Sequence, residues 1–88
     1  MRVTLKLYAM LRDHLPAEAD GRRSVGNELP LDMPEGATVQ SVIDRFNLPA
    51  KLVHLVLVNG VYVYPQARAA HALADNDELA IWPPIAGG

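Results

Sequence analysis

Two stretches in which apolar residues recur at every second position, one near each end of the chain, constrain the fold most. Val3, Leu5 and Leu7 alternate with polar residues near the N-terminus, and Leu79 and Ile81 repeat this period near the C-terminus. A period of two is typical of a β-strand that buries one of its faces. Because 88 residues allow only one domain, we expect a single core that contains both strands.

Between these strands the period changes to that of a helix. Val39, Val42, Ile43 and Phe46 follow the i, i+3, i+4, i+7 spacing of one buried helix face. Thr38 is a favourable N-cap, and Asn47 and Pro49 end the helix near residue 47.

Other strand and turn signals surround this helix. Asn59-Gly60 joins apolar residues 54–58 to residues 61–64 and predicts a tight hairpin, because both turn residues accept positive φ. Leu29, Leu31 and Met33 indicate a further strand. Pro30 places that strand at an edge, since proline has no amide hydrogen to donate.

Two segments are less regular. Tyr8, Leu11 and Leu15 predict a short helix or turn that Pro16 ends, and residues 17–27, which are polar and contain glycine, predict a mobile loop. The complete order is strand, strand, helix, strand, strand, strand. This order predicts an α+β fold of the β-grasp type, in which a mixed sheet of four to five strands has one main helix packed across it. We expect residues 1–82 to form this domain and residues 83–88 to form a flexible C-terminal tail.

Composition excludes several classes of function. A net charge of −2, a pI near 5.8 and scattered basic residues argue against nucleic acid as the main partner. The absence of cysteine excludes disulfides, zinc–thiolate sites and a cysteine nucleophile. No apolar run approaches the roughly 20 residues of a membrane span, so we expect a cytoplasmic protein without a membrane partner. His14, His54 and His71 lack metal-ligand spacing, and we expect no metal site.

The last six residues carry the strongest functional signal. Pro83-Pro84-Ile85-Ala86 leads to Gly87-Gly88, whose missing side chains would let a narrow thread enter a slot in another protein. The two prolines fix φ and lower the entropy that threading costs. The terminal carboxylate could then be presented to ATP and activated as an acyl adenylate.

These residues resemble the MoaD/ThiS-type sulfur-carrier family of ubiquitin-like β-grasp proteins. The C-terminal part of the resemblance is the segment from Leu73 to Gly88, with its turn at residues 75–77, an apolar strand, two prolines and a diglycine. Asn76 stands where the family usually has glycine, and asparagine also tolerates a left-handed turn. Residues 8–12, 35–39 and 58–60 agree as well, and the Pro-Pro-Ile-Ala-Gly-Gly ending is closer to the MoaD side.

The resemblance implies a carrier without catalytic side chains and without a bound cofactor of its own. The reactive group would be the Gly88 carboxylate, which a ubiquitin-activating-type adenylyltransferase would adenylate with MgATP. A persulfide donor would then convert it to a thiocarboxylate. As the small subunit of molybdopterin synthase, the carrier would dock on the large subunit and deliver this sulfur to a pterin precursor.

Candidate docking residues lie before the tail. Trp82 should face opposite to Ile81, and Tyr62 and Tyr64 could extend an exposed aromatic surface, because aromatic residues supply much of the binding energy at interfaces. The alternative is that some of these rings are core. Asp75, Asp77 and Glu78 could meet a basic groove of the activating enzyme, or could simply be solvated turn residues.

Three other functions stay open from the sequence. One is a ThiS-like carrier for thiamin or another sulfur-transfer pathway. The second is a ubiquitin-like modifier whose Gly88 is joined to lysines. The third is a β-grasp binding module in which the diglycine is incidental.

Overall fold

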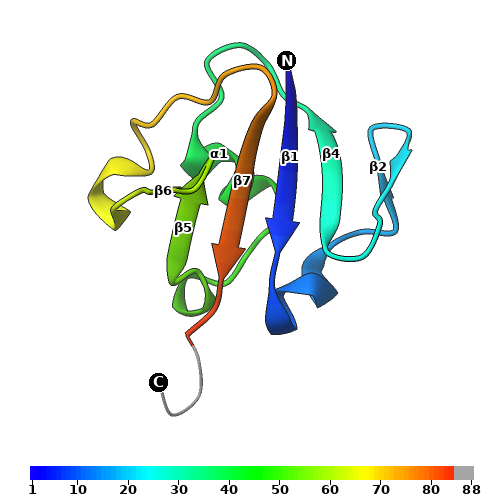
Figure 1. Ribbon diagram of the computed structural model, residues 1–88, viewed down its shortest axis with the longest axis horizontal. Helices are drawn as coiled ribbons and strands as arrows, with labels where there is room; N and C mark the ends of the chain where they lie inside the picture. Colours follow the sequence, from blue (N-terminus) through cyan, green and yellow to red (C-terminus); the bar gives the residue numbers. More distant parts are fainter. Residues whose placement is uncertain (85–88) are drawn as a thin grey trace.

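The computed structural model describes residues 1–84 of the chain. The expectations for Ile85, Ala86, Gly87 and Gly88, including the flexibility of this part of the tail, fall outside the described residues. Residues 1–84 form a five-stranded sheet with the helix α1 against one face, which is the predicted β-grasp fold (Figure 1). Within them, no helix is long and apolar enough to cross a membrane.

The sheet has the strand order β4-β1-β7-β5-β6. The terminal strands β1 and β7 pair in parallel at its centre, and every other pairing is antiparallel. This pairing confirms that the two terminal alternations form strands of a single core. The five strands are β1 (Arg2–Leu7), β4 (Glu28–Asp32), β5 (Leu55–Val58), β6 (Val61–Tyr62) and β7 (Asp77–Trp82).

The helix α1 (Val39–Arg45) begins at the predicted cap. Thr38 Oγ1 accepts a hydrogen bond from the Ser41 backbone N–H at 3.2 Å, and Ser41 Oγ accepts one from the Thr38 N–H at 2.8 Å. The two residues therefore satisfy each other's free amides. Val39, Val42 and Ile43 are buried as the spacing predicts, whereas Phe46 follows the helix as its C-cap and is partly buried against the core.

The core lies between the sheet and α1. Each large apolar side chain that is fully buried contributes about 1.5–3 kcal/mol relative to exposure. The largest fully buried side chains include Leu5, Leu7, Leu11, Leu29, Leu31, Leu79 and Ile81. Three short 3-10 helices complete the connections: η1 (Ala9–His14), η2 (Ala50–Leu52) and η3 (Pro65–Ala67). The first of these confirms the short helix that was expected after β1.

The prediction of a mobile loop at residues 17–27 is wrong, because this segment contains a β-hairpin. Its strands β2 (Glu18–Ala19) and β3 (Arg22–Arg23) pair antiparallel. Asp20 and Gly21 form the turn with φ values of 55° and 74°. An Asp-Gly pair is a strong hairpin signal. The flanking residues are polar, however, and this composition led to the prediction of a loop.

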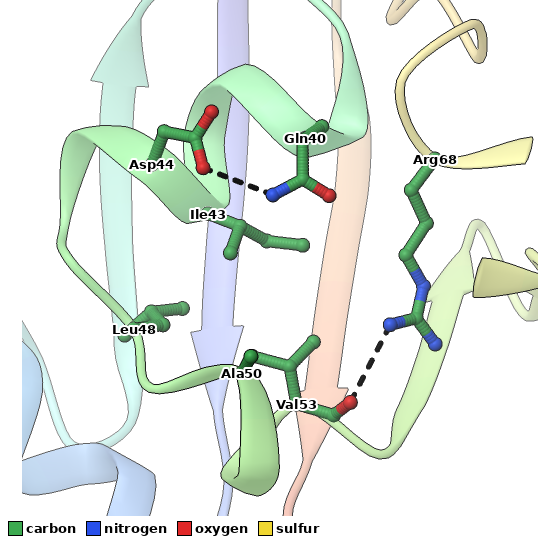
Figure 2. Close-up of a pocket in the computed structure, with 7 residues that line it drawn as sticks. All are labelled: Gln40, Ile43, Asp44, Leu48, Ala50, Val53 and Arg68. Carbon is green, nitrogen blue, oxygen red and sulfur yellow. Dashed lines mark hydrogen bonds between the residues drawn. The ribbon is translucent and has the colours of Figure 1, made fainter. Parts of the chain in front are cut away.

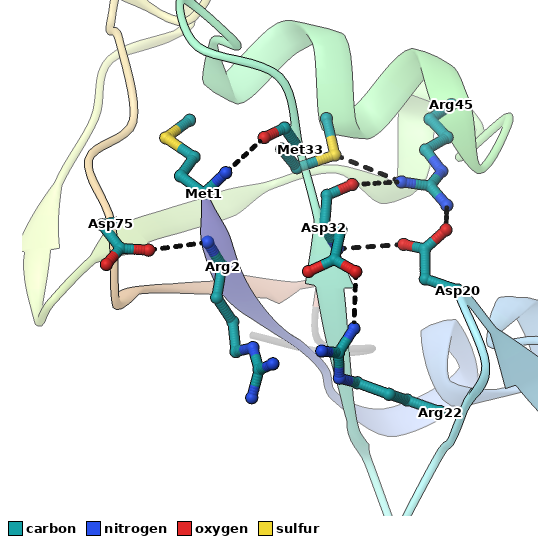
Figure 3. Close-up of polar contacts among 8 residues, drawn as sticks. All are labelled: Met1, Arg2, Asp20, Arg22, Asp32, Met33, Arg45 and Asp75. Atoms are coloured by element: carbon teal, nitrogen blue, oxygen red, sulfur yellow. Dashed lines mark hydrogen bonds and ion pairs between the residues drawn. The ribbon is translucent and has the colours of Figure 1, made fainter.

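This hairpin covers the outer edge of β4. Met1 and Met33 exchange backbone hydrogen bonds, so residues 28, 30 and 32 turn their backbone groups away from β1. The Asp32 N–H donates to Asp20 Oδ2 at 2.9 Å, and the Asp32 carbonyl accepts from Arg45 Nη1 at 3.3 Å (Figure 3). Arg45 Nη2 and Asp20 Oδ1 also form an ion pair at 2.8 Å.

Most of the other outward backbone groups of β4 are also unavailable for pairing. Glu28 exchanges both backbone hydrogen bonds with Val25, at 2.9 and 3.0 Å, and Pro30 has no N–H. An exposed strand edge is a template for pairing with another chain, and here side chains and the hairpin occupy it. Few backbone groups of β4 are therefore free to pair with another chain.

Candidate docking surface and the base of the tail

The face of the sheet opposite α1 carries the candidate site. Strand register places Leu55 opposite Trp82, and Leu57 opposite both Ala80 and Tyr62, so these side chains share that face. Together with Tyr8 they form what we call the aromatic surface, defined as Tyr8, Leu55, Leu57, Tyr62 and Trp82. Its side chains come from β5, β6, β7 and the residue after β1.

Trp82 and Tyr8 form the part of the aromatic surface next to the tail. Their rings are stacked with centroids 3.8 Å apart and an interplanar angle of 7°. The backbone supports the stack, because the Tyr8 N–H donates to the Ile81 carbonyl at 3.1 Å. Ile81 is fully buried and Trp82 only partly, which confirms that the two side chains face opposite ways. Tyr8 is a site residue that the sequence interpretation missed.

Tyr62 extends the aromatic surface toward the edge strand β6. It is 40% exposed, and its ring meets that of Tyr64 edge-on with centroids 5.0 Å apart. Tyr64 is 65% exposed and Leu55 is 36% exposed. Neither tyrosine is therefore a core residue. Large, rigid side chains with this exposure are the kind that anchor protein interfaces.

A charged cluster borders the aromatic surface on the β1 side. Lys6 lies opposite Ala80 in the register and forms ion pairs with Glu28, at 3.1 Å, and with Glu78. Hydrogen bonding to Glu78, and then to Glu28, raises the pKa of Lys6 above its ordinary value. Lys6 is thus held as a cation between two carboxylates. Glu78, a candidate from the sequence, belongs to this cluster.

Asp75 and Asp77 lie at the opposite end of β7 from Trp82. Five strand steps separate Asp77 from Trp82, or about 17 Å. Asp75 Oδ1 accepts from the Arg2 N–H at 2.7 Å, and Asp77 accepts from Asn59 Nδ2 and the Ala74 N–H, both at 2.8 Å. The structure does not bring these carboxylates to the aromatic surface, and their contact with an activating enzyme stays a prediction.

The tail leaves the sheet beside the aromatic surface. The His54 N–H donates to the Trp82 carbonyl at 3.0 Å, so the backbone is held to the last strand residue. Pro83 is buried and Pro84 is exposed. These are the first two of the six residues expected to form the tail, and the last four lie beyond the described part.

A pocket on the α1 side of the sheet is separate from this surface. Its volume is about 170 Å³, and Ile43, Leu48 and Arg68 are among the residues that line it (Figure 2). The buried Arg68 donates to the carbonyls of Val53, at 3.4 Å, and His54, at 3.2 Å. Arg68 thereby ties the segment after η3 to the start of β5, which holds β5 in place behind the aromatic surface. Residues 1–84 contain no group of three or more metal-ligating side chains.

Comparisons with known proteins agree with the β-grasp fold and with the family resemblance seen in the sequence. The sequence model of the ThiS family matches residues 16–88. The structure of SAMP1 from Haloferax volcanii is similar with a TM-score of 0.66 and 26% identity, covering 100% of both chains. A second structure, of H. volcanii small archaeal modifier protein 1, has a TM-score of 0.61 and 25% identity over 96% of this chain and 98% of that one.

A third similar structure comes from Pyrococcus furiosus and is assigned as molybdopterin converting factor, subunit 1. Its TM-score is 0.64 and its identity 22%, over 96% of this chain and 98% of that one. At this identity the likeness concerns the fold. No curated protein matches the chain in sequence.

Proposed function

We propose, from the premise that this chain belongs to the ThiS family of ubiquitin-like sulfur carriers, that its Gly88 carboxylate carries sulfur as a thiocarboxylate. The observation that best supports the proposal is the path of strand β7 from the sheet centre to the tail. This strand runs through the centre of the sheet, ends at Trp82 on the aromatic surface, and continues into the Pro-Pro-Ile-Ala-Gly-Gly sequence. A partner that grips the aromatic surface would therefore hold the base of the segment that leads to Gly88.

The proposed chemistry begins with activation by a partner. An adenylyltransferase of the ubiquitin-activating type binds the carrier through the aromatic surface and supplies MgATP. A Gly88 carboxylate oxygen attacks the α-phosphate, pyrophosphate leaves, and an acyl adenylate forms. The carrier's part is to position this carboxylate, since proximity and orientation can lower a barrier by several kcal/mol.

Sulfur must come from another molecule, because the chain has no cysteine. We infer a persulfide donor whose terminal sulfur attacks the Gly88 carbonyl carbon and displaces AMP. A second thiol then attacks the donor's own thiol sulfur in this acyl disulfide. The donor and the second thiol become joined by a disulfide, and the thiocarboxylate of Gly88 is released. Each step transfers a group that a partner supplies, so the carrier contributes its terminus and no side chain.

For the acceptor, we propose the pterin precursor of the molybdenum cofactor, with this chain as the small subunit of molybdopterin synthase. The Pro-Pro-Ile-Ala-Gly-Gly ending supports this choice over a thiamin pathway. The test is to supply the purified thiocarboxylate form with the synthase large subunit and pterin precursor. Transfer of sulfur to the pterin is expected, whereas transfer only to a thiazole precursor by the thiamin enzymes would place the chain in the other pathway.

The activation step is tested by changing only the length of the tail. Deleting Gly88 shortens the reach by about 3.5 Å, and adding an alanine after Gly88 lengthens it and adds a Cβ. Because errors near 1 Å can cost about 100-fold in rate, both variants should lose ATP–pyrophosphate exchange with the cognate enzyme. The matched control is Val25→Ala, an exposed change on the hairpin side. Wild-type activity of both tail variants would contradict the proposal.

Protein modification is the second candidate, and the likeness to the Haloferax small archaeal modifier protein over the whole chain favours it. In this function the activated Gly88 would be transferred to a lysine of a target protein instead of to sulfur. Mass spectrometry of the protein isolated from cells separates the two. Replacement of one terminal oxygen by sulfur supports the carrier, and branched peptides that contain the C-terminal residues support the modifier.

A further inference from the structure

The amino groups of this chain differ sharply in their surroundings. The sequence contains two lysines, Lys6 and Lys51, in addition to the N-terminal amine. An amine attacks a carbonyl carbon through its lone pair, so only an unprotonated and accessible amine can be acylated. The two lysines can therefore be ranked by the contacts that each of them makes.

Lys6 is held on the open face of the sheet. Its side chain is 22% exposed and lies between Glu28 and Glu78, which stabilise the protonated form. The resulting rise in pKa reduces the fraction of free amine. Lys6 also shares its face with the aromatic surface, so a partner bound there would cover it. Two independent features thus make Lys6 a poor nucleophile.

The N-terminal amine also forms a hydrogen bond. It donates to the Met33 carbonyl at 2.8 Å and is partly buried. It precedes β1, and the start of β1 lies beside the start of β7 in the parallel register. The N-terminal amine therefore sits at the end of the sheet away from Trp82.

Lys51 is exposed on η2, and within residues 1–84 it takes part in no hydrogen bond or ion pair. The bond from His54 N–H to the Trp82 carbonyl, 3.0 Å long, places the chain just after η2 beside the end of β7 (Figure 1). Ala50 lines the pocket together with Ile43 of α1, so η2 lies on the helix side of the sheet (Figure 2). Lys51 is therefore near the base of the tail but off the docking face.

We propose that Lys51 is the lysine of this chain that accepts activated acyl groups, including the activated Gly88 of a carrier molecule when no sulfur donor is present. This inference rests on the proposed function for the identity of the acyl group. Lys51 Nζ attacks the Gly88 carbonyl carbon of the acyl adenylate, the carbon–oxygen bond to AMP breaks, and the amine proton passes to solvent. An amide between Lys51 and Gly88 results, and AMP leaves.

The position of Lys51 gives this reaction its selectivity. An activating enzyme bound to the aromatic surface covers the side of the sheet that holds Lys6. It leaves η2 accessible next to the point where the tail emerges. Lys51 is then the accessible one of the two lysines. Sulfur transfer and acylation of Lys51 would compete for the same adenylate.

The first test needs no activating enzyme. The whole protein is treated at neutral pH with a limiting amount of the N-hydroxysuccinimide ester of acetic acid, and acetylated peptides are quantified over time. Lys51 should be acetylated faster than Lys6, because Lys51 is exposed whereas the Lys6 ammonium is held in ion pairs with Glu28 and Glu78. Equal rates at the two lysines, or faster reaction of Lys6, would overturn the ranking.

The second test uses the cognate activating enzyme with MgATP and without a sulfur donor. An amide between Gly88 and Lys51 is expected in wild type and in Val25→Ala, an exposed change on the hairpin side. It should be absent in Lys51→Arg. If pyrophosphate exchange proceeds normally but Lys51 stays unmodified, this inference fails alone. If no exchange occurs, the proposed function fails, and the chemical test still decides the ranking of the two lysines.

Discussion

The indole of Trp82 lies flat on the phenol ring of Tyr8, with ring centroids 3.8 Å apart. The two residues belong to opposite ends of the sequence and meet because β1 and β7 run in parallel through the centre of the sheet. The stack fixes the orientation of an otherwise partly exposed indole at the base of the tail. The aromatic surface is thus preorganised, which reduces the ordering cost of binding.

Replacing Trp82 with alanine should weaken docking while leaving the domain folded. We expect a loss of about 2 kcal/mol or more in binding to the activating enzyme, because a preordered aromatic side chain is a typical interface anchor. Isothermal titration calorimetry measures the affinity, and Val25→Ala serves as the control on a distant exposed residue. A large fall in thermal stability with unchanged affinity would show instead that Trp82 acts in the core.

The cap of α1 makes a second prediction, concerning stability. Thr38→Ala removes the acceptor for the Ser41 N–H and should destabilise the domain by about 1 kcal/mol. Urea unfolding followed by circular dichroism gives this value. Thr38→Ser retains the hydroxyl and should recover most of the loss, so equal destabilisation by both variants would argue against the capping role.

The elements that are determined by short-range sequence patterns could be predicted from the sequence. The Val39/Val42/Ile43 stripe and the Thr38 cap predicted α1, and Asn59-Gly60 predicted the β5–β6 hairpin. The edge position of β4 followed from Pro30, because a proline there removes one backbone donor. Alternation at both ends predicted the strands β1 and β7, which lie at the centre of the sheet.

Features that depend on register between distant segments could not be predicted in the same way. The stack of Tyr8 on Trp82 requires the parallel pairing of β1 with β7, and the pairing of Lys6 with Glu28 and Glu78 requires three strands in register. The hairpin at residues 18–23 is a different case. Asp20-Gly21 signalled it, but strands of two residues are too short to show a period.

The covered edge of β4 makes a third prediction, concerning self-association. Pro30→Val would add an N–H that points away from β1, next to the carbonyl already exposed there, and would so create a site for pairing with another strand. We expect concentration-dependent association, measurable by analytical ultracentrifugation. Pro65→Ala, which changes an exposed proline outside the sheet, is the matched control. If the Pro30 variant stays monomeric at the highest concentration tested, the hairpin and side chains alone protect the edge.

The ion pair of Asp20 makes the stability of the hairpin depend on pH. The hydrogen bond from Arg45, followed by that from the Asp32 N–H, lowers the pKa of Asp20 below its ordinary value of 3.8. Ionised Asp20 therefore stabilises the folded state above its unfolded pKa of about 3.9, and this contribution is lost as the pH falls through the lower folded pKa. Acid should weaken the attachment of the hairpin to β4 and α1.

Asp20→Asn tests this dependence, because asparagine tolerates the positive φ of the turn and can still accept from Asp32. At pH 7 the variant should be less stable by about 0.5–1 kcal/mol, as for a partly exposed ion pair. Urea unfolding at pH 7, 5 and 3 should show this difference shrinking at the lowest pH. Glu18→Gln, on the same hairpin, should show no such trend. A difference that stays constant at all three pH values would mean that asparagine disturbs the turn, and that the charge of Asp20 is not what holds the hairpin.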